Sequence, residues 1–506
     1  MGKILENRIS RFDGGVTNDS RDTAENVCQM VTNFDITNPK KLTPYRESES
    51  GNANASIDKI ENFCVALDAN GTDYILYGLG VVSGQTYARL LTKNTFSDGT
   101  WTDATTGASA SLAVNPNLLV YYKKVGTYGT IYGARGGATI WSYNIQSAVF
   151  TESAYNIADF TKISQGLVHS KDDIMYFGAD NTIIKNDNGS FSVALTLPSH
   201  YYITSICEYG NLLAIGVSHL SGNNSRIYLW DRDSTLTTLS ETIDWGSGSL
   251  KILEEIDGKL IGISIDSYYD GTNQIVTRFN DVITFKYLSG NTAITFKKII
   301  GTTNSQLPIA KQKINSKLHF MMSVVIDGIR REGVWSLGRS VEGSPFALVH
   351  ERTPNNNTAL AGGELKNFFY AGDYLFIAST TTSATATYQL VKTNDSALYT
   401  ATSIYETVKY SAGDIVLTKQ LIKVGVMFEF LPSGATVVLK YKKDEEILWT
   451  QIFSHATADS LEHSTEIIES SGNNLPQFKE IKFRIESTVG AEITGLKFKV
   501  EIIDEL

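Results

Sequence analysis

The clearest pattern along the chain is an apolar, β-branched run that follows a polar turn, crosses a second turn and continues as another such run. This unit begins at Asp73, Gly129, Asp172, Gly210, Gly258, Ser316 and Asp373. The spacing varies from 38 to 58 residues and averages about 50. Repeats of that length with several strands each are typical of β-propeller blades rather than of helical arrays.

Further strands are expected within these units. The runs ITSICEYG, LKILEEIDG and LKNFFYAGD precede or overlap the turns at Gly210, Gly258 and Asp373, which gives three or four strands per unit. Trp141, Trp230 and Trp335 follow the second turn of their units and are expected to pack between sheets. We therefore predict an irregular β-propeller over residues 59–400. Seven blades are preferred, and a merged or split unit would give six or eight.

The two flanking regions have a different pattern. Residues 1–58 have few long apolar runs and are expected to form an extended N-terminal arm. Within the arm, DTAENVCQMV favours one or two helical turns capped by Asp22 or Thr23. Residues 401–506 contain long alternating strands, and alternation places Ile481, Phe483 and Ile485 on one face. They predict a small C-terminal β-sandwich, so the whole chain is expected to be all-β.

Charge and cysteine content narrow the function classes. The 506-residue chain has a formal net charge of −10, which argues against general phosphate binding. Its three cysteines have no metal-type spacing and predict free buried thiols in a protein made in a reducing cytosol. The N-terminus has no long apolar segment typical of a secretion signal, and no stretch approaches the ~20 apolar residues that cross a bilayer.

A search for enzymatic motifs gives no catalytic residue. The turn SDGTW, residues 97–101, is the nearest approach to the Asp-box of sialidase-type propellers, but it occurs once and is compressed. No GxSxG, P-loop or Rossmann fingerprint is present, and GARGG, residues 133–137, is interpreted as a hairpin turn. We therefore predict a non-enzymatic protein.

No cofactor or metal is predicted either. The seven histidines lack the spacing of a metal motif, although ligands can converge in space. Acidic turns such as KNDNGS, residues 185–190, and DSYYDGTN, residues 266–273, could hold calcium. The same residues are favoured in tight hairpin turns, which is the preferred interpretation.

The flanking regions resemble a known family. Gly14 and Gly15 followed by Val16, then Asn33, then KLTPYR (residues 41–46), resemble the segment that precedes the propeller in tail nozzle and tail-stabilisation proteins of short-tailed bacteriophages. The C-terminal region resembles a sandwich found in phage structural proteins. The matching residues there are Leu431 to Gly434, Leu439 to Tyr441, Trp449, Thr450 and Phe478 to Ile481.

This resemblance implies a structural virion protein, made in the host cytoplasm and located in the phage tail, where it would form a nozzle or hub that continues and gates the DNA channel. Its partners would be further copies of the chain in a ring of six, the portal and adaptor, other tail proteins and, transiently, DNA in the channel, with no membrane insertion. The implied partner interface includes Phe12, Gly14, Gly15, Asn33, Pro44 and Arg46. Three alternatives remain open: a tail-tip receptor-binding or decoration protein, a propeller glycan hydrolase, and a monomeric interaction propeller.

Overall fold

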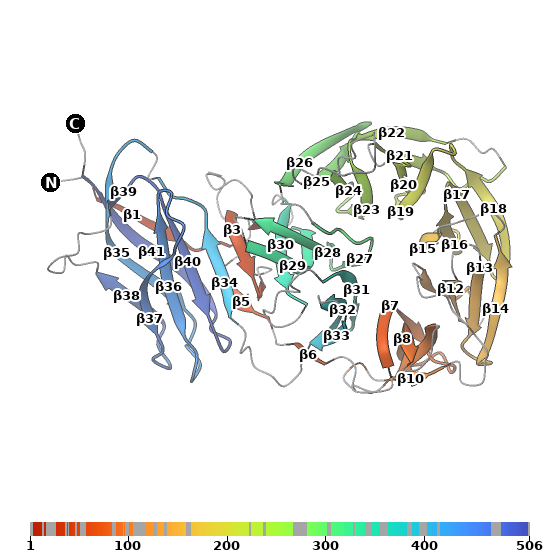
Figure 1. Cartoon of the computed structure of the whole chain (residues 1–506), viewed down its shortest axis with the longest axis horizontal. Helices are drawn as coiled ribbons and strands as arrows, with labels where there is room; N and C mark the ends of the chain where they lie inside the picture. The colour runs from red at the N-terminus through yellow and green to blue at the C-terminus, as the bar shows by residue number, and fades with distance from the viewer. Residues whose placement is uncertain are drawn as a thin grey trace. The chain divides into compact units, whose positions relative to one another are not determined.

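A computed structural model describes most of the chain (Figure 1). The described residues are 4–12, 15–16, 27–35, 38, 40–45, 48–50, 57–82, 88–94, 96, 101–104, 118–124, 129–135, 139–157, 163–221, 224–235, 239–266, 281–300, 305–326, 329–339, 346–354, 363–381, 387–393, 402–411, 415–466 and 477–503. Every regular element in these ranges is a β-strand.

The chain forms two compact units. The sandwich unit comprises Met1–Ser48, Gly333–Ala359 and Asn394–Leu506, and the propeller unit comprises Glu49–Glu332 and Leu360–Thr393. The structure thus divides the chain differently from the predicted boundaries at residues 58 and 400. The reason is strand pairing, because N-terminal strands pair with strands near the C-terminus.

Antiparallel four-stranded sheets build the propeller unit. The first is β7 (Ile57–Leu67), β8 (Tyr74–Val82), β9 (Ala88–Lys93) and β10 (Thr102–Asp103). The second is β11 (Leu119–Tyr122), β12 (Thr130–Arg135), β13 (Thr139–Asn144) and β14 (Val149–Asn156). The third is β15 (Ile163–His169), β16 (Ile174–Ala179), β17 (Thr182–Asp187) and β18 (Ser190–Thr196). The fourth is β19 (Tyr201–Tyr209), β20 (Leu212–His219), β21 (Ser225–Trp230) and β22 (Glu241–Gly246).

The remaining propeller strands follow the same order. The next sheet is β23 (Ser249–Ile256), β24 (Lys259–Asp266), β25 (Val282–Ser289) and β26 (Thr292–Ile300). The hairpin of β27 (Lys311–Ile314) and β28 (Lys317–Ile326) comes next. The last sheet is β31 (Leu365–Ala371), β32 (Tyr374–Thr381), β33 (Thr387–Thr393) and β6 (Ser48–Ser50). Its fourth strand therefore comes from a part of the chain far earlier in sequence than the other three.

Strands of these sheets contact one another in a closed order, through the first strand of each sheet except at the β27–β28 hairpin, where β28 makes the contacts. β7 contacts β11, which contacts β15, then β19, then β23, then β28, then β31, and β31 contacts β7 again. Figure 1 shows the sheets following one another from β7 to β33 around this circle. The predicted β-propeller is confirmed, while the preferred number of seven blades stays a prediction.

Six of the predicted repeats correspond to the second and third strands of a sheet. In the repeat that begins at Gly258 the first run is β24, while the predicted second run, residues 273–281, lies almost entirely outside the described residues. Turns between neighbouring strands of a sheet are often made by residues that tolerate positive φ. Asp257 and Gly258, at φ 50° and 73°, join β23 to β24 in this way, and Asn188 and Gly189, at 50° and 91°, join β17 to β18. Asn-Gly and Asp-Gly pairs favour such two-residue hairpin turns. The hairpin interpretation of residues 185–190 is therefore confirmed.

Tryptophans fill the space between and within the sheets. Trp141, Trp230 and Trp335 are fully buried, as predicted. Gly133 on β12 lies directly beneath Trp141, where a Cβ would stand 2.2 Å from the indole ring. On β24, a Cβ at Gly262 would likewise lie 2.5 Å from the indole ring of Trp245. These glycines are required because the indole rings occupy the space that their side chains would need.

Two packed sheets form the sandwich unit. One consists of β1 (Ile4–Ile9), β41 (Ile493–Ile502), β35 (Lys419–Phe428) and β38 (Glu462–Glu466), with β39 (Gln477–Phe478) beside β35. The other runs from β30 (Ala347–Arg352) through β3 (Val27–Thr32), β34 (Ser403–Thr407), β40 (Ile481–Ser487) and β36 (Val437–Lys443) to β37 (Thr450–His455). β2 (Gly15–Val16) pairs with β3, and β29 (Ile329–Gly338) pairs with β30 from Val334 to Gly338. A short pair, β4 (Phe34–Asp35) and β5 (Thr43–Pro44), completes the unit.

The core of this unit lies between the two sheets and includes residues from both ends of the chain. Phe12 and Val31 are buried in the same cluster as Val424, Ile485 and Phe498. Ile481 and Phe483 are buried there too, as the predicted alternation required. The predicted β-sandwich is thus confirmed, but it also includes strands from the first 58 residues.

The helical expectation for DTAENVCQMV is wrong in its second half. Val27–Thr32 is β3, which pairs with β2, β30 and β34, and Cys28 and Val31 are buried in the sandwich core. Tertiary pairing on both edges outweighs the local helical preference. Asp22 and Thr23, the expected caps, lie outside the described residues.

Candidate functional site

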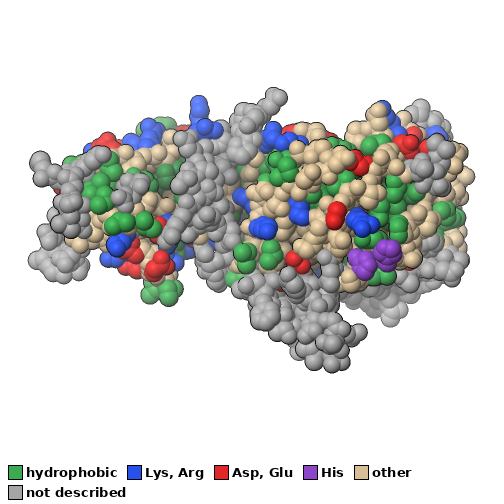
Figure 2. Space-filling model, turned by 90° about the horizontal axis from the view of Figure 1, so that it is seen from above, with side chains coloured by type: hydrophobic (Ala, Val, Ile, Leu, Met, Phe, Trp, Pro, Cys, Tyr) green, Lys and Arg blue, Asp and Glu red, His purple; other side chains and the backbone are tan. Residues whose placement is uncertain are grey.

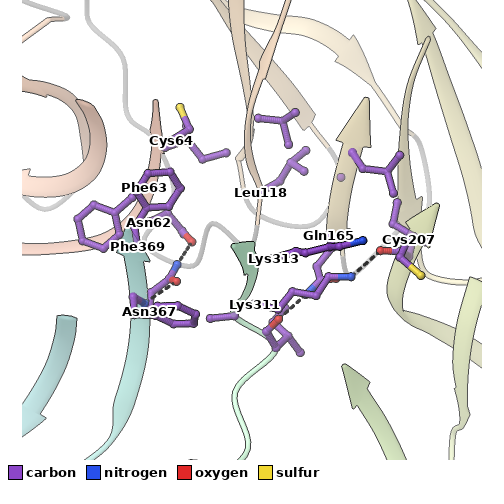
Figure 3. Close-up of a pocket in the computed structure, with 18 of the residues that line it drawn as sticks. Asn62, Phe63, Cys64, Leu118, Gln165, Cys207, Lys311, Lys313, Asn367 and Phe369 are labelled. Carbon is purple, nitrogen blue, oxygen red and sulfur yellow. Dashed lines mark hydrogen bonds between the residues drawn. The ribbon is translucent and has the colours of Figure 1, made fainter. Parts of the chain in front are cut away.

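A large hollow of the propeller unit lies at its centre. The first strands of the sheets surround a cavity of about 830 Å³ (Figure 3). Such a volume falls in the range of small-ligand pockets, about 300–1,000 Å³. The lining residues come from β7, β11, β15, β19, β23, β27 and β31. This cavity is the candidate functional site.

A segment that precedes β27 reaches into the cavity. Gln306 at its start is fixed to the beginning of β31, since its Nε2 donates to the Gly363 carbonyl and its Oε1 accepts from the Leu365 amide, both at 2.9 Å. Further along, the carbonyl of Ile309 accepts a hydrogen bond from Gln165 Nε2 on β15. The segment therefore connects two strands that are not neighbours in the circle.

Lys311 links three strands at the cavity wall. Its Nζ donates to the carbonyls of Ile206 on β19, at 2.8 Å, and of Leu253 on β23. It also lies 3.0 Å from Glu254 Oε2. The first strand of a blade exposes an unpaired backbone edge, and here one ammonium group satisfies carbonyls on two such edges.

A second chain of hydrogen bonds runs beside Lys311 and includes Gln165, which Figure 3 labels. Ser205 Oγ donates to Gln165 Oε1 at 2.9 Å and accepts from the Leu253 amide at 3.0 Å. Together with the Gln165 bond to Ile309, it joins β15, β19, β23 and the inserted segment. The arrangement fixes the wall on this side of the cavity.

The other charged residues of the cavity also have partners. Lys313 Nζ lies 3.0 Å from Glu255 Oε2. Glu208 accepts hydrogen bonds from the Ser170 amide and hydroxyl, at 2.5 and 2.7 Å. The three lining glutamates are balanced by three lining lysines, so the cavity has no marked charge.

The wall formed by β7, β11 and β31 is more apolar. Phe63, Leu118, Val120 and Phe369 line it, and Asn367 Nδ2 donates to Asn62 Oδ1 at 2.7 Å across the strand boundary. A neutral cavity with one apolar and one polar wall can accept a small polar ligand or a short peptide segment. Among the described residues, no group of three or more His, Cys, Asp or Glu side chains could hold a metal ion.

The predicted interface residues lie elsewhere, in the sandwich unit. Phe12 is fully buried and packs edge-on against Tyr405 at 5.2 Å between ring centroids. Gly15 has a φ of 74°, and a Cβ there would meet the Leu348 backbone. Asn33 has a φ of 59°, and its Nδ2 donates to the Thr402 carbonyl at 3.2 Å.

Pro44 on β5 is also buried. These four residues therefore have internal packing and turn roles, with little surface to offer to another subunit. Gly14 and Arg46 lie outside the described residues. So do residues 97–100 of the SDGTW turn, whereas its Trp101 is fully buried.

The structure brings some of the scattered histidines together. His200 and His219 lie 5.5 Å apart between ring centroids, and His455 and His463 lie 4.3 Å apart. His319 is a strand residue of β28, as expected. Sequence reasoning missed Lys311 and Gln165, because nothing in their local sequence distinguishes them from other polar strand residues.

On the face drawn in Figure 2, Lys and Arg side chains are interspersed with Asp and Glu among the described residues. Within the described part of the chain, no helix is long and apolar enough to cross a membrane.

Comparisons with known proteins give only distant structural likenesses. No protein-family model matches it, and a search of curated proteins gives no match. Among solved structures, the Dos1 propeller is 10% identical over 69% of this chain and 95% of that chain, with a TM-score of 0.41. The WD40 domain of Neurospora crassa Pan2 is 8% identical over 70% and 96%, with a TM-score of 0.40.

A glycoside hydrolase family 43 arabinoxylan arabinofuranohydrolase from Bacillus subtilis is 9% identical over 90% of this chain and 98% of that chain, with a TM-score of 0.29. These likenesses concern fold alone, and no activity follows from them. The chain is an all-β protein that contains a β-propeller.

Proposed function

We propose that the protein is a structural subunit of a phage tail, in which six copies form a ring that continues the DNA channel below the portal and adaptor. The observation that carries the proposal is the composition of the sandwich unit. Residues of both resembling regions, Gly15 and Asn33 from the first and Leu439 and Ile481 from the second, belong to this one unit. The two regions that resemble phage structural proteins, some 400 residues apart in the sequence, therefore belong to one compact unit.

The chain path also suits a load-bearing role. The chain passes between the two units four times, after residues 48, 332, 359 and 393. Four chain connections share a pulling load that a single linker would carry alone. A closed ring of identical subunits is the symmetry expected around a channel.

The proposal is tested by the mass of the purified protein and by its presence in particles. Native mass spectrometry and electron microscopy are expected to show a closed ring, and quantitative proteomics of purified virions a fixed copy number. A monomer at all concentrations that is also absent from virions would overturn the proposal.

A second candidate is a tail-tip receptor-binding protein, and the central cavity favours it. Its volume and its mixed apolar and polar walls suit a small part of a host receptor. This candidate predicts that the isolated protein binds host cells, and that filling the cavity by Leu118→Trp abolishes binding while the fold is retained. A ring in virions together with no cell binding would favour the first function over the second.

A further inference from the structure

A second hollow lies on the outer face of one sheet of the sandwich unit. It has a volume of about 550 Å³ and is lined by residues of β1, β41, β35 and β38. On β1, alternation turns Leu5 and Ile9 toward the core, while Glu6 and Arg8 are exposed. The hollow is thus on the side of the sheet that faces away from the sandwich core.

The strand register explains why the sheet is hollow here. Arg8 pairs with Lys497, Lys497 with Gly425, and Gly425 with Ser464, which makes one row across four strands. Gly425 has no side chain, so this row is open between Lys497 and Ser464. A Cβ at Gly425 would lie only 2.5 Å from the Cβ of Ser464, so the close approach of β38 requires a glycine at this position.

Cations outnumber carboxylates around this hollow. Its lining includes four cationic residues, Arg8, Lys423, Lys497 and Lys499, and two carboxylates, Glu6 and Glu462. This excess occurs on a chain whose formal net charge is −10. A local positive potential on an acidic protein attracts anionic ligands selectively.

The ion pairs within the hollow are weak enough to be exchanged. Lys497 Nζ lies 3.5 Å from Glu462 Oε2, and both side chains are about half exposed, at 49% and 59%. Lys499 pairs with Glu6, with exposed fractions of 45% and 64%. Exposed pairs of this kind contribute little to stability. An incoming anion can therefore replace the carboxylates at small cost.

The remaining lining indicates the chemical class of the ligand. A volume of about 550 Å³ exceeds that of a lone ion and suits one or two sugar rings. Ser464 and the carboxylates of Glu6 and Glu462 can hydrogen-bond hydroxyl groups. Met427 adds an apolar side chain beside Gly425. We propose that this hollow binds an acidic saccharide, with its carboxylate held by Lys497, Lys499 and Arg8 and its hydroxyls by Ser464, Glu6 and Glu462.

The proposal is independent of the tail assembly and is tested on the full chain in solution. The probe is a short oligomer of galacturonic acid, measured by isothermal titration calorimetry at low salt. A neutral glucose oligomer of the same length and inorganic sulfate are the comparison ligands. We expect the acidic oligomer to bind at least tenfold more tightly than either, and the affinity to fall as salt increases.

Two variants test the location. Lys497→Gln is expected to weaken binding at least fivefold, and Ser464→Tyr, which fills the hollow without changing its charge, to abolish it. The matched control is Lys40→Gln, which removes one exposed positive charge of the same unit outside the hollow and should leave the affinity unchanged. Equal affinity for sulfate and the acidic oligomer would mean an adventitious ion site only and would overturn the proposal. So would full binding by Ser464→Tyr, or an equal loss in Lys40→Gln.

Discussion

Lys311 on β27 and Glu254 on β23 form an ion pair at the wall of the central cavity, with Nζ 3.0 Å from Oε2. The same ammonium group donates to carbonyls of β19 and β23. Both side chains are mostly buried, at 12% and 16% exposed. One residue therefore fastens three strands from different sheets at the centre of the propeller.

Replacing Lys311 by Met should destabilise the protein. The variant leaves a carboxylate and two carbonyls without their common donor, and we expect a loss of about 2–3 kcal/mol in the free energy of unfolding. Urea unfolding followed by tryptophan fluorescence measures it. The control is Lys313→Met, which removes a pair whose lysine is 40% exposed, and its expected effect is within about 1 kcal/mol. Equal losses in both variants would contradict the fastening role.

A methyl group at Gly262 should not fit beneath Trp245. A Cβ there would lie 2.5 Å from the indole ring, so Gly262→Ala is expected to cost about 1–3 kcal/mol through overpacking. Combining it with Trp245→Phe should recover part of the loss, because the smaller ring leaves room for the methyl group. A double-mutant cycle of unfolding free energies measures this coupling. Strict additivity of the two changes would argue against direct contact.

The repeat could be recognised from sequence because its strands alternate with short polar turns. A further recurring feature is a glycine within the second strand of each of the first five sheets, at Gly78, Gly133, Gly178, Gly216 and Gly262. At each one a Cβ would collide with a neighbouring side chain. Local patterns of this kind identify blades.

The membership of the sandwich could not be read in the same way. β1 pairs with β41, and β3 with β34, across more than 370 residues, and no local pattern encodes such a pairing. The N-terminal segment therefore seemed to be a separate arm. The central cavity was missed for a related reason, since Gln165, Lys311 and Glu254 meet only when the propeller closes.

Glu406 on β34 is a buried carboxylate whose removal should be costly. It is 2% exposed and lies 2.8 Å from Lys482 Nζ, and it also pairs with Arg484. Glu406→Gln removes the buried anion that two cations of β40 share, although Arg484 keeps Glu486 Oε1 at 3.5 Å, and we expect a loss of about 3–5 kcal/mol. Glu445→Gln is the control, because that residue is 85% exposed and pairs only at the surface. The test is the thermal unfolding temperature of both variants. A decrease for Glu406→Gln no larger than that for Glu445→Gln would refute the stabilising role of Glu406.

The cysteine thiols should be unreactive in the folded protein. Cys28, Cys64 and Cys207 are buried and none of them is in a disulfide, as the sequence predicted. Burial raises the pKa of the Cys64 and Cys207 thiols well above the usual range, which suppresses the reactive thiolate. Titration with a thiol-specific chromogenic reagent at pH 8 is expected to label neither residue in native protein and all three in urea. Rapid native labelling of Cys64, located by peptide mass spectrometry, would show that the propeller centre opens readily.

The stacked pair of His455 and His463 should make the sandwich unit sensitive to acid. Burial, and then the neighbouring His463, lower the pKa of His455 below its usual value of about 6.5. The unfolded chain therefore binds this proton more readily than the folded chain does. The stability contribution is present above pH ~6.5 and decreases as the pH falls toward the lower folded-state pKa.

Hydrogen exchange of the Glu462–Glu466 strand, measured by mass spectrometry between pH 8 and pH 5 and corrected for the intrinsic rate, reports the effect locally. We expect protection to fall below pH 6.5 in the native sequence. His455→Phe keeps an aromatic ring between Phe428 and His463 but cannot take up a proton, so its protection should depend less on pH. His200→Gln removes a histidine of the propeller unit and should leave the profile of this strand unchanged. An identical acid response in His455→Phe and the native protein would assign the sensitivity to other groups.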